Sequence, residues 1–382
     1  NQGGLLFILN EENMTAVVYR NASSNGDIFI PKTIEYAFKK FVITGIAEAA
    51  FNSSNKIQLI QFSEDSELQT IFKSSFSNSS LVAISIPKSV TRIEKLAFNG
   101  CNHLRSIQFH KNSELKVFER QLFQWSSIES IEIPSCIQIM RDGWCSGILK
   151  LDKLKINDSS NKKNISLFEN SLIVGKSDIK SDEFDVVHFA RRDIEKVTIP
   201  IGIRAILPYS FENCVHIKNV TFSEHSNLRL IDKFAFNKSS IESITIPDRL
   251  EYIGDFSFSM CKKLKNVYFS NDSELHSINR FAFSKSSIQS IQIPKKVTKI
   301  SESAFRECSQ LESVYFSENS NLRVIENSAF SWSAIQKVEI PSHVTKICDM
   351  AFSSCYGLKE VEFADDSELK SIGQFAFSTS SI

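Results

Sequence analysis

Apolar residues recur along this chain in a hexamer with apolar first, fourth and sixth positions. The pattern L/I-x-x-I/V-x-I/F starts at Ile57, Leu81, Leu104, Ile128, Leu151, Ile194, Ile217, Ile241, Leu264, Ile288, Leu311, Ile335 and Leu358. Side chains alternate between the two faces of an extended segment, so the fourth and sixth residues share a face. The hexamers therefore predict short strands, each with one buried face.

Prolines mark the spacing of the hexamers. Intervals of 47 residues separate Pro87 from Pro134, and separate successive members of the set Pro200, Pro247, Pro294 and Pro341. Each period divides into halves of 23 and 24 residues, and units of about 20–29 residues that open with L-x-x-L-x-L are the signature of leucine-rich repeats. One unit cannot bury its apolar face alone, so stacked units are expected to form one parallel sheet over a continuous core.

Phenylalanine is the preferred aromatic residue, with 31 Phe against 7 Tyr and 3 Trp. Most units carry Phe after a small residue, and we predict that these rings stack as a spine: Phe51, Phe98, Phe211, Phe236, Phe258, Phe283, Phe305, Phe330, Phe352 and Phe377. The Ala that often precedes this Phe predicts a short helical turn. The expected fold is a leucine-rich-repeat solenoid of the α/β horseshoe type, with short parallel strands and short helical turns on its convex side.

The repeat pattern divides the chain into four segments. Residues 1–50 are irregular and predict an N-terminal cap, with strands at Leu5–Leu9 and Ala16–Tyr19. Regular repeats fill 51–156 and 194–382, and the pattern stops at Ile382 without a cap, so we expect the array to continue. Residues 157–193 lengthen one period and contain strand-like runs at 171–175 and 184–190. This insertion is either a decorated coil or a dedicated partner site.

Charge and hydropathy exclude several classes of partner. The 44 basic and 44 acidic residues balance, which gives no electrostatic reason to expect nucleic acid or an anionic membrane. No apolar run reaches the roughly 18 residues of a membrane span. We therefore expect protein partners, and no nucleic acid or direct membrane contact.

No residue pattern indicates catalysis or a cofactor. The seven His are scattered, and neither a metalloprotease motif nor a glycine-rich phosphate loop is present. Acidic loops at 64–67, 272–274 and 365–368 lack the spacing of a calcium loop. They are simpler to interpret as turns in which Ser caps the next segment. The prediction is a protein that is not an enzyme, with no cofactor and no metal.

Five of the eight cysteines repeat in phase, each 14 residues after a repeat proline: Cys101, Cys214, Cys261, Cys308 and Cys355. Because coils stack at about 5 Å, residues two coils apart lie roughly 10 Å apart, beyond the limit of about 7 Å between the Cα atoms of a disulfide. These residues are therefore predicted to be buried free thiols. Cys136, Cys145 and Cys348 fall outside the phase, and a bridge between Cys136 and Cys145 remains an alternative.

The exposed fifth position of each hexamer provides a candidate binding surface, because the concave sheet of a solenoid is its natural binding face. Aromatic residues dominate binding hot spots. We predict a protein-binding patch made of Tyr268, Gln292, Tyr315, Glu339 and Glu362. The alternatives are that these are ordinary solvated strand residues, or that binding uses Trp125 and Trp332, which each follow a spine Phe by two residues.

These motifs resemble the BspA-like leucine-rich-repeat family. The stretch K-V-E-I-P-S-H-V-T-K-I-C-D-M-A-F-S-S-C at 337–355 is similar to its repeat, and 175–195 resembles a segment of its trichomonad members. The resemblance implies a surface antigen or adhesin that binds host or matrix proteins, at the cell surface or secreted. Nine N-x-S/T sequons favour that location. Unpaired cysteines instead favour the alternative, a cytoplasmic interaction scaffold.

Overall fold

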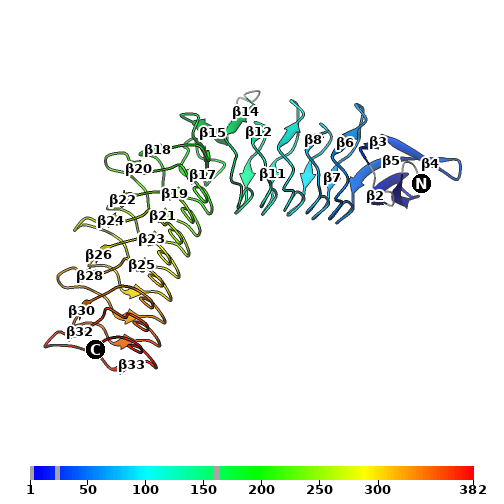
Figure 1. The fold of residues 1–382 in the computed structure, drawn as a ribbon. Coiled ribbons are helices and arrows are strands. Elements are labelled where there is room, and N and C mark those ends of the chain that lie inside the picture. Colours follow the sequence, from blue (N-terminus) through cyan, green and yellow to red (C-terminus); the bar gives the residue numbers. More distant parts are fainter. Residues whose placement is uncertain (1–3, 22–25, 158–163) are drawn as a thin grey trace. The chain divides into compact units, whose positions relative to one another are not determined.

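The computed structural model describes residues 4–21, 26–157 and 164–382. The chain divides into two compact units, Asn1–Asp182 (unit 1) and Glu183–Ile382 (unit 2), and each is described by itself. Each unit is a stack of coils (Figure 1). Most coils consist of a longer strand, a tight turn, a two-residue strand and a return segment.

The thirteen hexamers all contain strands, which confirms that prediction. In unit 1 these longer strands form a parallel sheet with β3 in the order β14-β12-β10-β8-β6-β3. Their bounds are β3 Ile28–Ile30, β6 Leu59–Phe62, β8 Ala83–Ile86, β10 Ser106–Phe109, β12 Ser130–Ile133 and β14 Lys153–Ile156. Ile60, Ile84, Ile107 and Ile131, at the fourth position of the hexamer, point into the core.

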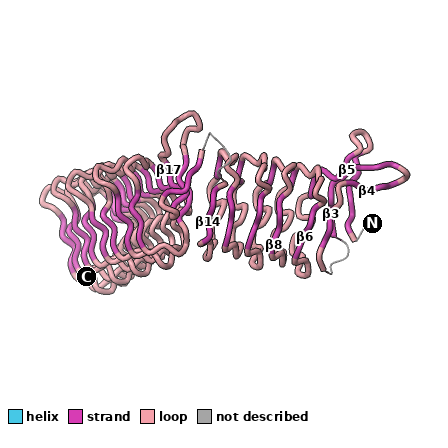
Figure 2. The backbone as a smooth tube through the Cα atoms, turned by 90° about the horizontal axis from the view of Figure 1, so that it is seen from above, coloured by secondary structure: helices cyan, strands magenta, loops and turns pink. Residues whose placement is uncertain are grey.

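Unit 2 repeats this arrangement in its own parallel sheet, which we call the long-strand sheet of unit 2. Its strands are β18 Lys196–Ile199, β20 Asn219–Phe222, β22 Ser243–Thr245, β24 Asn266–Tyr268, β26 Ser290–Ile293, β28 Ser313–Phe316, β30 Lys337–Ile340 and β32 Glu360–Phe363. Successive strands lie side by side within each unit (Figure 2).

A second set of strands completes each coil, and the hexamer pattern did not predict it. In unit 1 these are β7 Thr70–Ile71, β9 Arg92–Ile93, β11 Val117–Phe118 and β13 Ile139–Met140. In unit 2 they are β17 Val186–Ala190, β19 Ala205–Ile206, β21 Leu230–Ile231, β23 Tyr252–Ile253, β25 Ser277–Ile278, β27 Lys299–Ile300, β29 Val324–Ile325, β31 Lys346–Ile347 and β33 Ser371–Ile372. Each is parallel to its neighbour, as in the pair β23–β25.

The irregular segments contain strands where the sequence predicted them. β1 (Leu5–Asn10) and β2 (Thr15–Asn21) are antiparallel, and β2 pairs with β5 (Lys39–Ile46), which also pairs with β4 (Thr33–Tyr36). The run at 171–175 contains β16 (Leu172–Gly175), which forms a hairpin with β15 (Ile165–Phe168). The run at 184–190 contains β17, the strand that pairs with β19. The first residues of the insertion, 158–163, lie outside the described residues.

The helical turns predicted for the return segments are wrong, because no described residue belongs to a helix. Alternate backbone N–H groups point toward the next coil. Those of Phe256, Phe258 and Met260 donate to carbonyl oxygens one coil further on, at 2.9, 2.7 and 2.8 Å. The N–H groups between them, such as those of Ser257 and Ser259, donate to the carbonyl oxygen three residues earlier. Phe256 and Met260 adopt left-handed φ values of 56° and 60°. This alternating geometry replaces the i to i−4 bonds that a helix needs.

The predicted phenylalanine spine is confirmed in both units. In unit 2 it runs without interruption through Phe211, Phe236, Phe258, Phe283, Phe305, Phe330, Phe352 and Phe377, with ring centroids 4.7–5.4 Å apart and rings within 14° of parallel. In unit 1 Phe76 and Phe123 complete the stack with Phe51 and Phe98. The ten predicted rings did not include these two. Leu122, before Phe123, is not a small residue, but Ser75 before Phe76 fits the pattern as Ser257 does before Phe258.

The in-phase cysteines are buried free thiols, as predicted, and none of the eight cysteines forms a disulfide. Four of the in-phase cysteines donate a hydrogen bond to the carbonyl oxygen of the preceding spine Phe and contact a Ser hydroxyl, so these small groups satisfy carbonyl oxygens of the loop backbone. Cys308, for example, lies 3.1 Å from the Phe283 oxygen and 3.4 Å from the Ser286 hydroxyl. The exception is Cys214, whose Sγ lies 3.2 Å from the Arg192 guanidinium.

Candidate protein-binding face

The five residues predicted as a binding patch form one row on the long-strand sheet of unit 2. They lie in register on adjacent strands in the order Tyr268, Gln292, Tyr315, Glu339 and Glu362. The residue before each of the first four is buried, so the alternation of the strand turns the row outward. In β32, Val361 is half-buried and Phe363 is 42% exposed. Tyr268 and Tyr315 are 55% and 60% exposed, and Glu362 alone is only half-exposed.

The chemistry of this row changes along the unit. Its first three positions are Thr198, Thr221 and Thr245, and the hydroxyls of Thr198 and Thr221 lie 2.9 Å apart. From Tyr268 onward the side chains of the row are aromatic or acidic, apart from Gln292. The aromatic and acidic half therefore differs from a neutral half built on the same backbone.

A lysine organises the acidic end of the row. The Nζ of Lys337 lies 2.6 Å from Glu362 and 3.3 Å from Glu360. The hydrogen bond from Lys337 lowers the pKa of Glu362, and the bond to Glu362 raises the pKa of Lys337. Glu339, opposite Glu362 on the neighbouring strand, has no ion-pair partner among the described residues. Its carboxylate is left facing solvent.

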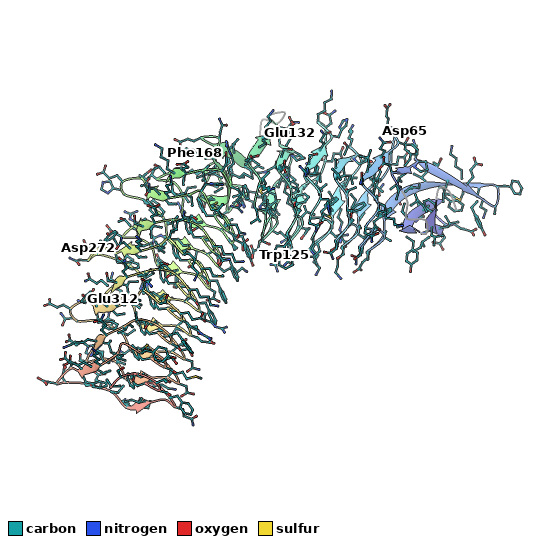
Figure 3. The ribbon with its side chains drawn as sticks, viewed as in Figure 1. Asp65, Trp125, Glu132, Phe168, Asp272 and Glu312 are labelled. Atoms are coloured by element: carbon teal, nitrogen blue, oxygen red, sulfur yellow. The ribbon has the colours of Figure 1, made fainter. Side chains whose placement is uncertain are left out.

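A hollow of about 670 Å³ opens beside the centre of the row, between β28 and β30. Tyr315 and Glu339 line it from the strands, and the loop at 317–320 and Pro341 close one end. The loop that follows β28 is longer than the proline turn that follows β30, so it projects beyond its neighbour. Figure 3 labels Glu312, at the other end of this hollow. It also labels Asp272, in the loop one period earlier that is equivalent to 317–320.

The alternative residues, Trp125 and Trp332, are both on the surface, with 63% and 48% of their side chains exposed. Trp125 belongs to unit 1, where it lies on the opposite side from Glu132 (Figure 3). Trp332 belongs to unit 2 and contacts Tyr356 edge to face at 5.8 Å. These two aromatic residues line a second hollow of about 550 Å³. Gln336 lines both this hollow and the one beside Tyr315.

Sequence reasoning missed Tyr356 and Lys337 as part of this surface. Tyr356 directly follows an in-phase cysteine, where the other units carry Asn102, Val215, Lys262 or Ser309. That single aromatic residue at an otherwise non-aromatic position was the available signal. The sequence contained no comparable signal for Lys337, because lysines are common at exposed strand positions.

The acidic loops are turns capped by serine, as predicted. The hydroxyls of Ser66, Ser273 and Ser367 accept hydrogen bonds from the backbone N–H two residues later, at 3.3, 3.3 and 3.4 Å. The side chain of Lys296 pairs with Glu274, and that of Lys32 pairs with Glu67. Within the described ranges, no three His, Cys, Asp or Glu side chains are grouped so that they could hold a metal ion.

Comparison with known families decides the identity of the repeats. Residues 44–175, 182–312 and 276–382 match the BspA type leucine-rich repeat region. The chain belongs to this family. The match covers most of the chain and agrees with the coils, the parallel strands and the phenylalanine spine.

Solved leucine-rich-repeat structures share the fold of this BspA-type protein. A leucine-rich repeat protein from Eubacterium ventriosum is 18% identical, with a TM-score of 0.68, over 100% of this chain and 94% of that one. The pneumococcal vaccine antigen PcpA is 18% identical (TM-score 0.61; 91% and 92% covered). A leucine rich cell surface protein from Faecalibacterium prausnitzii is 19% identical (TM-score 0.52; 95% and 94% covered).

No curated protein matches the chain. Among the described residues, no helix has the length and apolar character needed to cross a membrane.

Proposed function

We propose that this BspA-type protein is a non-enzymatic recognition or adhesion protein of the cell surface, which binds host or matrix proteins through the long-strand sheet of unit 2. The observation that carries the proposal is the exposed row of Tyr268, Gln292, Tyr315, Glu339 and Glu362 beside a hollow. Leucine-rich repeats are scaffolds that present a continuous sheet to a protein partner. The names of the Faecalibacterium cell-surface protein and the pneumococcal antigen support a surface role.

Two exposed tyrosines on one face suit protein recognition, because tyrosine buries a large area and loses little conformational entropy on binding. Tyr268 and Tyr315 are separated by one strand, β26, so both rings are available to one partner. Exposed apolar side chains gathered on a sheet also mark interaction sites more often than isolated ones.

The test is binding to a panel of immobilised, purified matrix and cell-surface proteins, followed by surface plasmon resonance with variants. Replacing both tyrosines with Ala is expected to weaken binding of any positive partner by about tenfold or more, as for hot-spot residues. Tyr252→Ala is the matched control, since Tyr252 is 47% exposed on the short strand β23. A correctly folded double variant that binds as tightly as the parent protein would disprove the role of this face.

A second candidate function is an intracellular interaction scaffold. One observation favours it: none of the eight cysteines forms a disulfide, and seven of them are buried. Unpaired thiols are typical of reducing compartments. The two candidates differ in whether exposed sequons carry glycans in the native protein.

A further inference from the structure

We infer that the hollow between β28 and β30 binds a positively charged side chain, arginine above all, from an exposed basic segment of the protein partner. This inference rests on the proposed function and names the chemistry of the partner. It comes from the charges around the hollow, from one exposed aromatic ring, and from comparison with an equivalent hollow in the same unit.

The lining of the hollow is acidic. Glu312, Glu318 and Glu339 contribute carboxylates, and none of the three has an ion-pair partner in the part of the chain that the structure describes. Lys337 is the one basic residue of the lining, and Glu360 and Glu362 already engage its ammonium group. The hollow therefore presents negative charge that no described basic side chain pairs with.

Tyr315 stands at the wall of this hollow, in register with Glu339 on the neighbouring strand. Adjacent strands are about 4.8 Å apart, so a guanidinium group that lies against the Tyr315 ring is within reach of the Glu339 carboxylate. Stacking on an aromatic face and a charged hydrogen bond to a carboxylate are the two interactions that arginine makes together. A lysine ammonium group makes only the second with comparable geometry.

A hollow of similar size, about 600 Å³, lies between β20 and β22 and provides an internal comparison. Thr221 and Thr245 occupy the places of Tyr315 and Glu339, and the charged lining residues are Asp248 and Arg249. The Arg249 guanidinium reaches Asn227 at 2.6 Å. The backbone thus forms similar hollows at both places, but only the one beside Tyr315 combines an aromatic wall with surplus negative charge.

The surplus charge selects the occupant. An acidic segment would be repelled, and an apolar side chain would leave carboxylates near an uncharged surface and partly dehydrated. A basic side chain instead neutralises them. Electrostatic attraction of this kind mainly accelerates association and weakens as salt concentration rises.

The experiment uses the full chain and three fluorescein-labelled glycine–serine peptides that carry two arginines, two glutamates or two leucines. Fluorescence anisotropy at about 50 mM and about 300 mM salt measures each affinity, since screening increases over this range. We expect the arginine peptide to bind best, and its binding to weaken at the higher salt concentration.

Variants of the hollow make the test specific. One variant replaces three glutamates with glutamine: Glu312→Gln, Glu318→Gln and Glu339→Gln. This triple Gln variant is expected to bind the arginine peptide about tenfold more weakly than the parent protein, and Tyr315→Ala about threefold more weakly. The matched control combines Glu224→Gln with Glu242→Gln. Glu224 occupies the loop position of Glu318 two periods earlier, and Glu242 lies exposed just before β22. The control is expected to bind the arginine peptide like the parent protein.

Three results would overturn the inference: equal or tighter binding of the leucine or glutamate peptide, no binding of any peptide at about 1 mM protein, or an unchanged affinity in the triple Gln variant. These failures are distinct from failure of the proposed function. A matrix protein that loses affinity when both tyrosines are replaced, without any preference for arginine peptides, would retain the binding face and reject the basic partner.

Discussion

The Sγ of Cys261 donates a hydrogen bond to the backbone carbonyl oxygen of Phe236, one coil earlier, at 3.0 Å. Its sulfur also lies 3.4 Å from the Ser239 hydroxyl. Each such contact links a thiol and a serine hydroxyl of the return segments to the backbone of a spine phenylalanine. The thiol therefore acts as a small hydrogen-bonding group in a dry environment, and burial raises the pKa of Cys261 to about 12.

These thiols are predicted to be unreactive while the protein is folded. Burial also raises the pKa of Cys101 and Cys308 to about 11, so almost no thiolate forms at pH 8. Titration with a chromogenic disulfide reagent should show one rapid thiol, Cys136, which is partly exposed. The Cys136→Ser variant should lose the rapid phase, and the remaining thiols should react at the rate of unfolding. Rapid reaction of several thiols in the folded protein would contradict this assignment.

The same pKa values predict that stability declines at high pH. The unfolded thiols ionise near pH 8.5, whereas the folded ones resist ionisation until about pH 11 to 12. The unfolded chain therefore loses protons first, and rising pH between these values favours unfolding. Urea denaturation at about pH 8 and pH 10 should show a smaller decrease for a Cys261→Ala and Cys308→Ala double variant than for the parent protein.

A central ring of the spine should be essential for stability. Phe283 is fully buried, with its ring centroid 5.1 Å from Phe258 and 5.4 Å from Phe305. Replacement by Ala is expected to lower the free energy of unfolding by about 3–5 kcal/mol. Tyr315→Ala, on the exposed face, should change it by less than about 0.5 kcal/mol. Thermal denaturation followed by circular dichroism measures both, and equal effects would show that stacking does not support the array.

The strands and the spine could be predicted from sequence because each depends on a residue that recurs at fixed spacing. Ile244 and Ile291, for example, are buried at equivalent positions of their hexamers. The return segments could not be predicted in the same way. Alanine before the spine Phe favours a helix locally, but the N–H of Phe258 finds its acceptor on Ala282, one coil away. Only the stack of coils supplies that acceptor.

The candidate binding face could likewise be predicted from the sequence only in part. Strand alternation sufficed to place Tyr268 and Tyr315 on one exposed row, with Gln292 of β26 between them. The hollow beside Tyr315 also depends on how far the loop after β28 projects and on which carboxylates remain unpaired. The spacing of the repeats predicts neither the projection of this loop nor which carboxylates lack an ion-pair partner. The contact of Trp332 with Tyr356 likewise requires the register of two return segments.

Arg192 is predicted to hold together the first coils of unit 2. Its buried guanidinium donates to the carbonyl oxygens of Ala190 and Ser210 at 3.0 and 2.9 Å, and lies 4.3 Å from the Phe189 ring centroid. Arg192→Met should fill similar space but leave these carbonyls without their donor, at a cost of about 3 kcal/mol. Urea denaturation measures the loss. The control is Arg191→Met, since Arg191 pairs with Asp193 nearer the surface. Equal stability of the two variants would contradict the role of Arg192.

Acid should destabilise unit 2 through His188. Burial lowers the pKa of His188 to about 4, whereas an unfolded His titrates near 6.5. Between these values the unfolded chain binds the additional proton, so stability is full above about pH 6.5 and declines toward pH 4. The loss by about pH 4 is on the order of 3 kcal/mol. The urea midpoint of His188→Gln should fall less between about pH 7 and pH 4.5 than that of the parent protein. Parallel decreases would reject the assignment.

Glycan occupancy of the native protein should distinguish a surface protein from an intracellular scaffold. Asn271 lies exposed in the loop after β24, in the sequon N-D-S. Asn237, in the sequon N-K-S, is buried, and its side-chain amide donates to Glu212 at 3.3 Å. A glycan on Asn237 would have to displace this bond and enter the coil stack, so the folded protein should carry none there. A surface protein from a cell that attaches N-glycans should carry one on Asn271.

Enzymatic deglycosylation in ¹⁸O-labelled water followed by peptide mass spectrometry identifies each occupied Asn. Label on Asn271 and none on Asn237 supports the surface role together with this fold. An unlabelled Asn271, with the other exposed sequons also empty, favours the scaffold, and label on Asn237 would contradict the packing around Glu212.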